Sequence, residues 1–341
     1  MSLRTSVLTL LVCVLAAAAQ AQQLTGVGGT FPAPVYRNWA KAAKTATGID
    51  LAYDAAGSGK GQAAAIAHTT DFGASDAPMP PDKLAANDLL QFPTLIGAIV
   101  PIVNLPRVRD DELKLSGQAL ADIYAGKIRK WNDPRLIKLN PGVKLPNVSI
   151  ATVHRYDASG SSFVFTSYLA SVSPEWKATV GIGEMVAWPV GAGAIGNDGV
   201  ATTVDIIRGG IGYVEYAFAV QNHLSTVRLR NHAGVFVQPT TASFAAAAAD
   251  WSVADFDTDP IDTRNPSGWP LVTPTFVLVS KDPEYLARTT RAVRFFNWAF
   301  ANGGAIATKL DFIPLPAAVR DRVRAAWHNA LGVPTDPIVA Q

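Results

Sequence analysis

The sequence predicts an α/β protein, and three observations support this fold class. Strand-like and helix-like segments alternate, glycines and prolines separate them, and 341 residues are enough for two domains with a sizeable core. Hydrophobic residues make up 49% of the chain and charged residues 16%, which excludes a disordered protein. The net charge of +2 is too small for a chain that coats nucleic acid, so no nucleic-acid partner is expected.

Hydrophobic or β-branched runs mark the expected strands. In chain order they are 51–53, 94–105, 149–154, 211–216 and 273–280. The segments 94–105 and 273–280 are the long hydrophobic ones, and they lie far apart in the sequence. A chain that crosses between two lobes more than once would show this pattern.

Capping residues and apolar periodicity mark the expected helices. They are expected at about 32–45 (with Gly48 as the C-cap), at 59–68, from the serines at 159–162 to Ala170, after Ser243, and at 317–329. In the last of these, Val319, Val323 and Trp327 share one face, which indicates packing and not ligand binding.

The N-terminus has the pattern of a secretory signal peptide over residues 1–21. Arg4 supplies a positive charge, 7–19 form an apolar stretch, and a small-x-small cleavage site precedes Gln22. The only cysteine, Cys13, lies inside this segment, so disulfides are excluded from the mature chain. A lipid anchor at Cys13 is the alternative, which the branched valine before it disfavours.

Several common motifs fail on inspection. The segment 57–61 has Gly and Lys but lacks the spacing and the Ser or Thr of a phosphate-binding P-loop. Gly26 and Gly28 begin a dinucleotide fingerprint whose third glycine position is Phe31. The five histidines are scattered, with no HExxH motif, and His154 beside Arg155 has no relay partner at a fixed spacing. No metal, cofactor or catalytic site is therefore expected.

Three expected helix starts share an anion-binding chemistry. They are Gly28-Gly29-Thr30-Phe31-Pro32, Gly57-Ser58-Gly59, and the run from Arg155 through Ser159, Gly160 and Ser161 to Ser162. A helix start presents unpaired N–H groups and a partial positive charge, which suit a phosphate or sulfate. The alternative interpretation is that these residues are ordinary helix caps.

An acidic residue close to these helix starts would discriminate between oxyanions. The segment 70–78 carries Asp71 and Asp76. A carboxylate repels a fully ionised anion but accepts a hydrogen bond from one that still carries a proton, as phosphate does near neutral pH. One aspartate could therefore select phosphate over sulfate, although a turn or cap role remains open for it from the residues alone.

Five blocks of the sequence resemble blocks of one protein family and follow one another in the same order as in that family. They are LTGVGGTFPAPVY, DFGASDAP, SGSSFVFTSYLA, GNDGVA and GGIGYVEYAFA. Together they resemble the phosphate-binding proteins of bacterial phosphate ABC transporters, the PstS family, from about Leu24 to near the C-terminus. The resemblance implies a type II periplasmic-binding-protein fold, with two lobes around a ligand cleft joined by hinge strands. It divides the chain into lobe I at 22–98 plus 268–341 and lobe II at 99–267.

The resemblance also implies a set of phosphate-binding residues. They are Thr30, Phe31, Ser58, Asp76, Arg155, Ser159, Gly160 and Ser161, with Asp157 pairing with and orienting Arg155. Two departures stand out, because Ser161 replaces the threonine of the family and Lys60 lies in a Gly-Lys-Gly sequence after Ser58. Lys60 is either a solvated side chain, which we favour, or a positive charge near the mouth of the cleft.

The function implied is that of a periplasmic, monomeric phosphate receptor, not an enzyme, which needs no cofactor and docks on transmembrane permease subunits. Three rival functions remain at this point. A phosphoryl-transfer enzyme would need a nucleophile with a base or a metal, and neither is visible. A receptor for a fully ionised oxyanion such as sulfate is disfavoured by Asp76. A receptor for arsenate is not disfavoured, because arsenate has the shape and the protonation of phosphate. An adhesion or signalling protein on the same fold is disfavoured because all the contact types are retained.

Overall fold

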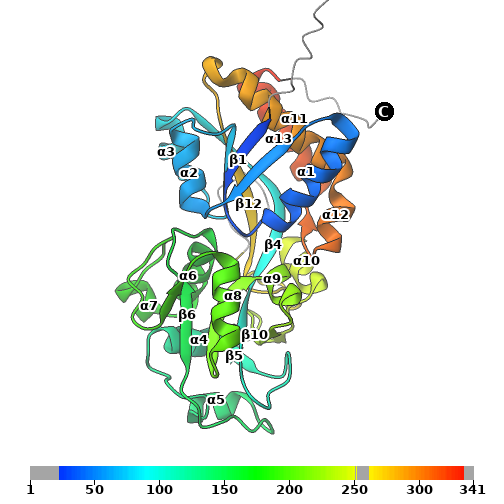
Figure 1. Ribbon diagram of the computed structural model, residues 1–341. Helices are drawn as coiled ribbons and strands as arrows, with labels where there is room; N and C mark the ends of the chain where they lie inside the picture. Colours follow the sequence, from blue (N-terminus) through cyan, green and yellow to red (C-terminus); the bar gives the residue numbers. More distant parts are fainter. Residues whose placement is uncertain (1–22, 250, 252–260, 334–341) are drawn as a thin grey trace, which may run out of the picture.

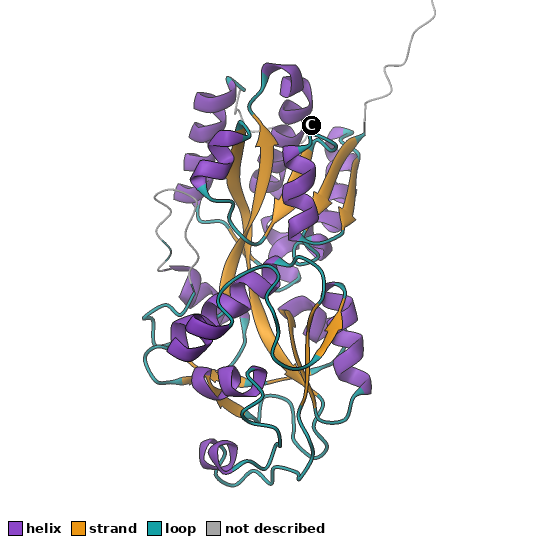
Figure 2. Ribbon diagram, turned by 90° about the vertical axis from the view of Figure 1, so that its left-hand side faces the viewer, coloured by secondary structure: helices purple, strands orange, loops and turns teal. Residues whose placement is uncertain are grey.

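The computed structural model describes residues 23–249, 251 and 261–333, and it confirms the α/β prediction. Helices lie on both sides of a mixed sheet, and the elements form two groups joined by long strands (Figures 1 and 2). The expected signal peptide at 1–21, with Cys13, falls outside the described residues. Within the described ranges, no helix combines the length and the apolar character that crossing a bilayer requires.

The group at the top of Figure 1 we call lobe I. Its elements are β1 (Leu24–Gly28), α1 (Ala33–Thr47), β2 (Leu51–Ala55), α2 (Ser58–Ile66), β3 (Phe72–Ser75), α3 (Pro81–Ala86), β12 (Val272–Ser280), a short 3-10 helix (Pro283–Tyr285), α11 (Leu286–Asn302), α12 (Gly304–Lys309), β13 (Ile313–Pro314) and α13 (Ala317–Leu331).

The group below it we call lobe II. Its elements are β5 (Lys114–Ser116), α4 (Gly117–Tyr124), α5 (Pro134–Leu139), β6 (Ala151–Arg155), α6 (Gly160–Val172), α7 (Pro174–Thr179), β7 (Ala192–Ala194), α8 (Gly196–Ile206), β8 (Gly210–Glu215), α9 (Tyr216–Gln221), β9 (Ser225–Thr226), β10 (Arg228–Arg230), β11 (Phe236–Val237) and α10 (Thr241–Ala249).

One strand belongs to both groups. β4 (Leu89–Val103) pairs antiparallel with β12 over its first part and with β8 over its last part, and the change comes between Ala98 and Ile99. The main sheet therefore runs in the order β2-β1-β3-β12-β4-β8-β6-β7, while β5, β10 and β11 form a separate small sheet. β4 is buried over nearly its whole length, which explains its long hydrophobic run. The lobe boundaries at 98/99 and 267/268 stay a prediction.

The parallel strands determine where polar side chains gather. β1 pairs in parallel with both β2 and β3, and β6 pairs in parallel with β8. In open α/β sheets, ligands bind beyond the carboxyl ends of the strands, where the strand order changes. All the residues expected to bind phosphate lie at or just beyond the carboxyl ends of β1, β2, β3 and β6, in the connecting loops or in the first turn of the helix that follows.

Aromatic packing holds each lobe around its sheet. In lobe I, Phe296 lies edge-on to Phe92 and Phe72, and Trp327 of α13 packs against Phe92 with centroids 5.0 Å apart. Val319, Val323 and Trp327 are buried, which confirms that the last helix is a packing element. In lobe II, Phe165 stacks on Tyr213 at 4.2 Å.

Eight strands among the described residues were not predicted from the sequence, namely β1, β3, β5, β7, β9, β10, β11 and β13. β1 and β3 are short and contain glycines, which have low strand propensity. The structure shows why a glycine is needed: a Cβ on Gly26 would lie 2.2 Å from the ring of Phe72. Other expectations hold closely, since the α1 helix ends at Gly48 with a left-handed φ of 75°.

Candidate functional site

The three expected helix starts meet at one place, and only one of them is explained by capping. Ser159 is the N-cap of α6, where its Oγ accepts a hydrogen bond from the backbone N–H of Ser162 at 3.2 Å. The caps of α1 and α2 are Pro32 and Gly57, and neither helix start has a side-chain cap. Thr30 and Ser58 are therefore available for another role, as the anion-binding interpretation requires.

Ser161 offers the site a hydroxyl that is unpaired within the described residues. It lies in the first turn of α6 and its side chain is buried. Its Oγ has no hydrogen-bond partner in the described part of the protein. A buried hydroxyl left unpaired costs about 1–3 kcal/mol, so such groups normally have a partner.

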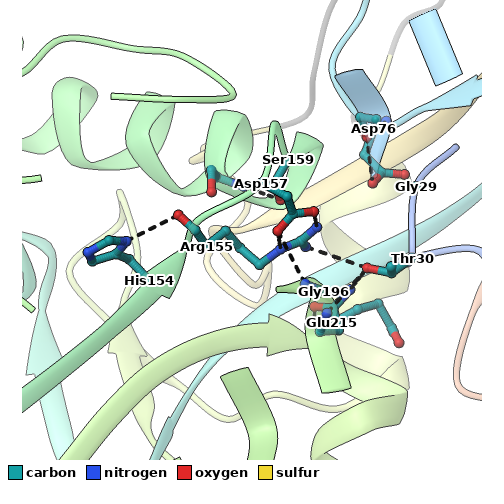
Figure 3. A network of polar contacts seen from close by, with 12 residues as sticks. Gly29, Thr30, Asp76, His154, Arg155, Asp157, Ser159, Gly196 and Glu215 are labelled. Carbon is teal, nitrogen blue, oxygen red and sulfur yellow. Dashed lines mark hydrogen bonds and ion pairs between the residues drawn. The ribbon is translucent and has the colours of Figure 1, made fainter. Parts of the chain in front are cut away.

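Arg155 is held in place by Asp157 at the end of β6. Its Nε donates to Asp157 Oδ1 at 2.7 Å and its Nη2 donates to Oδ2, which forms a bidentate pair (Figure 3). Burial raises the pKa of Asp157, but hydrogen bonds from Arg155 and its charge outweigh this effect, so the pKa stays below its ordinary value. Arg155 is almost fully buried, and its Nη1 also donates to Thr30 Oγ1 at 3.5 Å. A guanidinium has five N–H donors, so Arg155 can bind an oxyanion as well.

Asp76 lies directly after β3, at 1% exposure. Its Oδ1 accepts a hydrogen bond from Thr275 Oγ1 at 2.7 Å, and its Oδ2 accepts one from Ser58 Oγ at 3.3 Å. Burial raises the pKa of Asp76 to about 6, against the lowering effects of Thr275, Arg155 and Ser58. The carboxyl group is therefore mostly ionised above pH 6 and can accept a hydrogen bond from a ligand O–H group.

The two lobes touch at this point through glycines. A Cβ on Gly160 of lobe II would lie 2.6 Å from both Asp76 Cβ and Ser58 Oγ of lobe I. The N–H of Gly59 donates to the carbonyl of Ala158 across the lobes at 3.1 Å. The cleft is therefore closed, and the close approach of two backbones explains the glycines at these positions.

The structure places the remaining predicted residues as follows. Phe31 has a fully buried side chain that packs edge-on against Phe312, so only its backbone N–H can serve the site. Lys60 is exposed on α2 and lines a surface groove beside β1 and β2. Asp71, the other aspartate of the DFGASD block, pairs with Arg288 and Arg291 and has a structural role.

His154 packs against an aromatic side chain. His154 stacks on Trp188 with ring centroids 4.8 Å apart, and burial lowers its pKa. In the ranges that the structure describes, no three His, Cys, Asp or Glu side chains are grouped so that they could hold a metal ion.

Three polar residues at the site were missed by the sequence analysis. Thr275 lies on β12, where it holds Asp76. Glu184 of lobe II accepts a hydrogen bond from Gln62 of lobe I at 3.5 Å, and burial and the charge of Asp76 raise its pKa to about 7, although Lys83 lowers it. Asn197 contacts Thr30 at 2.8 Å. Only Asn197 lies in a block that carried the resemblance, so a local signal existed for it alone.

Comparison with known proteins identifies the family. Residues 15–302 match the family model described as the PBP superfamily domain. The phosphate-binding protein PstS of Pasteurella multocida is 47% identical over 332 residues, which covers 96% of each chain. The chain belongs to the PstS family. A second PstS, from Haemophilus influenzae, is 46% identical over 92% of this chain and 95% of that protein.

Solved structures agree on the fold. A phosphate ABC transporter substrate-binding protein from Clostridium perfringens, with bound phosphate, has a TM-score of 0.64 at 18% identity and covers 86% of this chain and 100% of that one. A phosphate-binding protein from Stenotrophomonas maltophilia has a TM-score of 0.67 at 20% identity, covering 89% and 94%. The resemblance to the PstS family, and with it the two-lobed periplasmic-binding-protein fold, is confirmed.

Proposed function

We propose that this chain is a receptor for inorganic phosphate, which it binds between its lobes and delivers to an ABC-transporter permease. The observation that carries the proposal is the gathering of Ser161, Arg155 and Asp76 at one closed cleft. Ser161 offers an unpaired buried donor, Arg155 a permanent positive charge, and Asp76 an acceptor. Relatives named as phosphate-binding proteins at 46–47% identity support the same function.

The proposed ligand contacts follow from the chemistry of each group. Thr30, Ser58, Ser159 and Ser161 offer hydroxyls, while Phe31 and Gly160 offer backbone N–H groups at the starts of α1 and α6. Arg155 supplies the charge, and Asp157 orients it. Most donors are neutral, so the oxyanion is bound mainly by directed hydrogen bonds rather than by a cage of cations.

Asp76 sets the specificity in this proposal. Above pH 6 its carboxylate is mostly ionised. Phosphate carries a proton that it can donate to this carboxylate, whereas sulfate presents only lone pairs and is repelled. Arsenate has the shape and the protonation of phosphate, so Asp76 does not discriminate against it.

We further propose a monomeric, periplasmic protein that acts by binding alone and needs no cofactor. The signal-peptide pattern at 1–21 supports export. Relatives at 46–47% identity are named as phosphate-binding proteins, which supports binding without phosphoryl transfer. Closure joins contacts from both lobes, which would allow a permease to recognise the loaded form.

Titration calorimetry of phosphate-stripped protein at pH 8 tests the proposal. We expect one-to-one binding of phosphate and no binding of sulfate. Equal binding of both would contradict the role of Asp76, and no binding of phosphate would refute the proposed function. Release of phosphate from a chromogenic ester, measured in parallel, would favour an enzyme instead.

A further inference from the structure

The Thr30 hydroxyl is surrounded by hydrogen-bond donors from lobe II. The side-chain Nδ2 of Asn197 lies 2.8 Å from Thr30 Oγ1, the backbone N of Asn197 lies at 3.3 Å, and Arg155 Nη1 lies at 3.5 Å. Figure 3 shows Thr30 facing Arg155 and the start of α8 at Gly196. A hydroxyl has two lone pairs and one proton. The donors occupy the lone pairs, so the proton of Thr30 must be donated elsewhere.

The orientation of the Asn197 amide is set by a second contact. Asn197 is fully buried at the start of α8. The backbone N–H of Glu215, at the end of β8, donates to Asn197 Oδ1 at 3.0 Å. A backbone N–H can only donate, so the oxygen of the amide faces Glu215 and the NH₂ group faces Thr30. Thr30 is therefore the acceptor in this pair.

We propose that Asn197 is a positioning residue for the ligand: it directs the Thr30 O–H toward a ligand oxygen when the lobes close. The inference rests on the proposed function, because it assumes a ligand in the cleft. Thr30 belongs to lobe I, whereas Asn197 and Glu215 belong to lobe II. The donation exists only in the closed form, so closure itself prepares Thr30 to bind.

The two residues make different demands on the ligand. Thr30 donates, so the ligand oxygen that it contacts accepts a hydrogen bond. An ionised Asp76 can only accept, so the oxygen that it contacts must carry a proton. The two residues together therefore suit an anion that offers both an acceptor oxygen and an O–H group.

A double-mutant cycle tests the proposal. Asn197→Asp keeps an acceptor for the N–H of Glu215 but replaces the NH₂ group by a second oxygen, to which Thr30 would donate instead of to the ligand. Thr30→Val removes the hydroxyl. Asn222→Asp is a matched control, because Asn222 is an exposed residue of lobe II that donates only to the carbonyl of Phe218. Phosphate affinity is measured by calorimetry, and urea unfolding of each ligand-free variant monitors the fold.

We expect Asn197→Asp to raise the phosphate Kd about 10- to 100-fold in the wild-type background and less than about 2-fold in the Thr30→Val background. An equal rise in Kd in both backgrounds would overturn the proposal. It would mean that Asn197→Asp acts through its added negative charge or through a general structural effect, neither of which needs Thr30. An unchanged Kd in the single variant would also overturn it. If Asn197→Asp does not fold, Asn197→Ala takes its place in the same cycle. Its rise in Kd should be smaller, because the backbone N–H at position 197 and Arg155 still donate to Thr30, and it should again depend on Thr30. Absence of phosphate binding by the wild-type protein would refute the proposed function itself.

Discussion

Replacing Asp76 by asparagine removes the charge of a buried carboxyl group at the site with little change in its size. Thr275 Oγ1 donates to Asp76 Oδ1 at 2.7 Å, so the oxygen of the new amide keeps this position. The NH₂ group then takes the place of Oδ2, which lies 3.3 Å from Ser58 Oγ. An acceptor that points into the cleft thereby becomes a donor.

The expected magnitude follows from the hydrogen bond that is lost. A hydrogen bond to a charged group contributes about 1.5–3 kcal/mol, so the phosphate Kd should rise about 10- to 150-fold. Sulfate no longer faces a buried carboxylate and gains a donor, so its Kd should fall by about 10-fold or more. The preference for phosphate over sulfate should therefore shrink by at least two orders of magnitude, on the order of the product of these changes.

The assay is calorimetric titration of both anions at pH 8, where Asp76 of the wild type is ionised because its pKa is about 6. Asp71→Asn is the matched control, since Asp71 lies in the same segment but pairs with Arg288 and Arg291 away from the cleft. This control should lower stability and leave the phosphate/sulfate ratio unchanged. A ratio in the Asp76→Asn variant equal to that of the wild type would refute the selectivity argument.

Further predictions concern the other groups of the site. Arg155→Ala should raise the phosphate Kd by at least about 10-fold with the ligand-free fold intact by circular dichroism, and an unchanged Kd would remove Arg155 from the site. Gly160→Ala should hinder closure, because its Cβ would lie 2.6 Å from atoms of the other lobe; X-ray scattering with phosphate should then report the open form, and a compact form would contradict this. The raised pKa of Glu184, about 7, means that its contribution to stability is full below about pH 4.5 and is lost as pH rises through 7. Glu184→Gln should therefore stabilise the protein at pH 8 by at most about 3 kcal/mol in urea unfolding and have no effect near pH 4.5; an equal gain at both pH values would contradict this explanation.

The sequence could predict the local features of this fold, because they depend on local patterns. The long hydrophobic run at 94–105 predicted a buried strand, although β4 begins earlier, at Leu89. Gly48 predicted the end of α1, because only glycine adopts a left-handed φ without strain. β1 was missed because the glycine that its packing needs lowers its strand propensity.

For the site, too, some residues could be predicted from the sequence and others could not. Arg155 and the three helix starts were predicted from the residues themselves, whereas the role of Asp157 came from the resemblance to the family. Thr275 lies 199 residues from Asp76, and the two meet only because β12 pairs antiparallel with β3. Glu184 meets Gln62 only when the lobes close. No local pattern marks partners that the topology and the closure bring together.

The central claim is that the closed cleft binds one phosphate whose protonated oxygen faces Asp76. A high-resolution crystal structure of the phosphate-soaked protein, grown without sulfate, tests it most directly. We predict one tetrahedral anion in contact with Ser161 Oγ and the Arg155 guanidinium, with one of its oxygens about 2.5–2.7 Å from Asp76, the short distance of an O–H donating to a carboxylate. An empty cleft at saturating phosphate, or an anion bound with Asp76 turned away from it, would contradict the account.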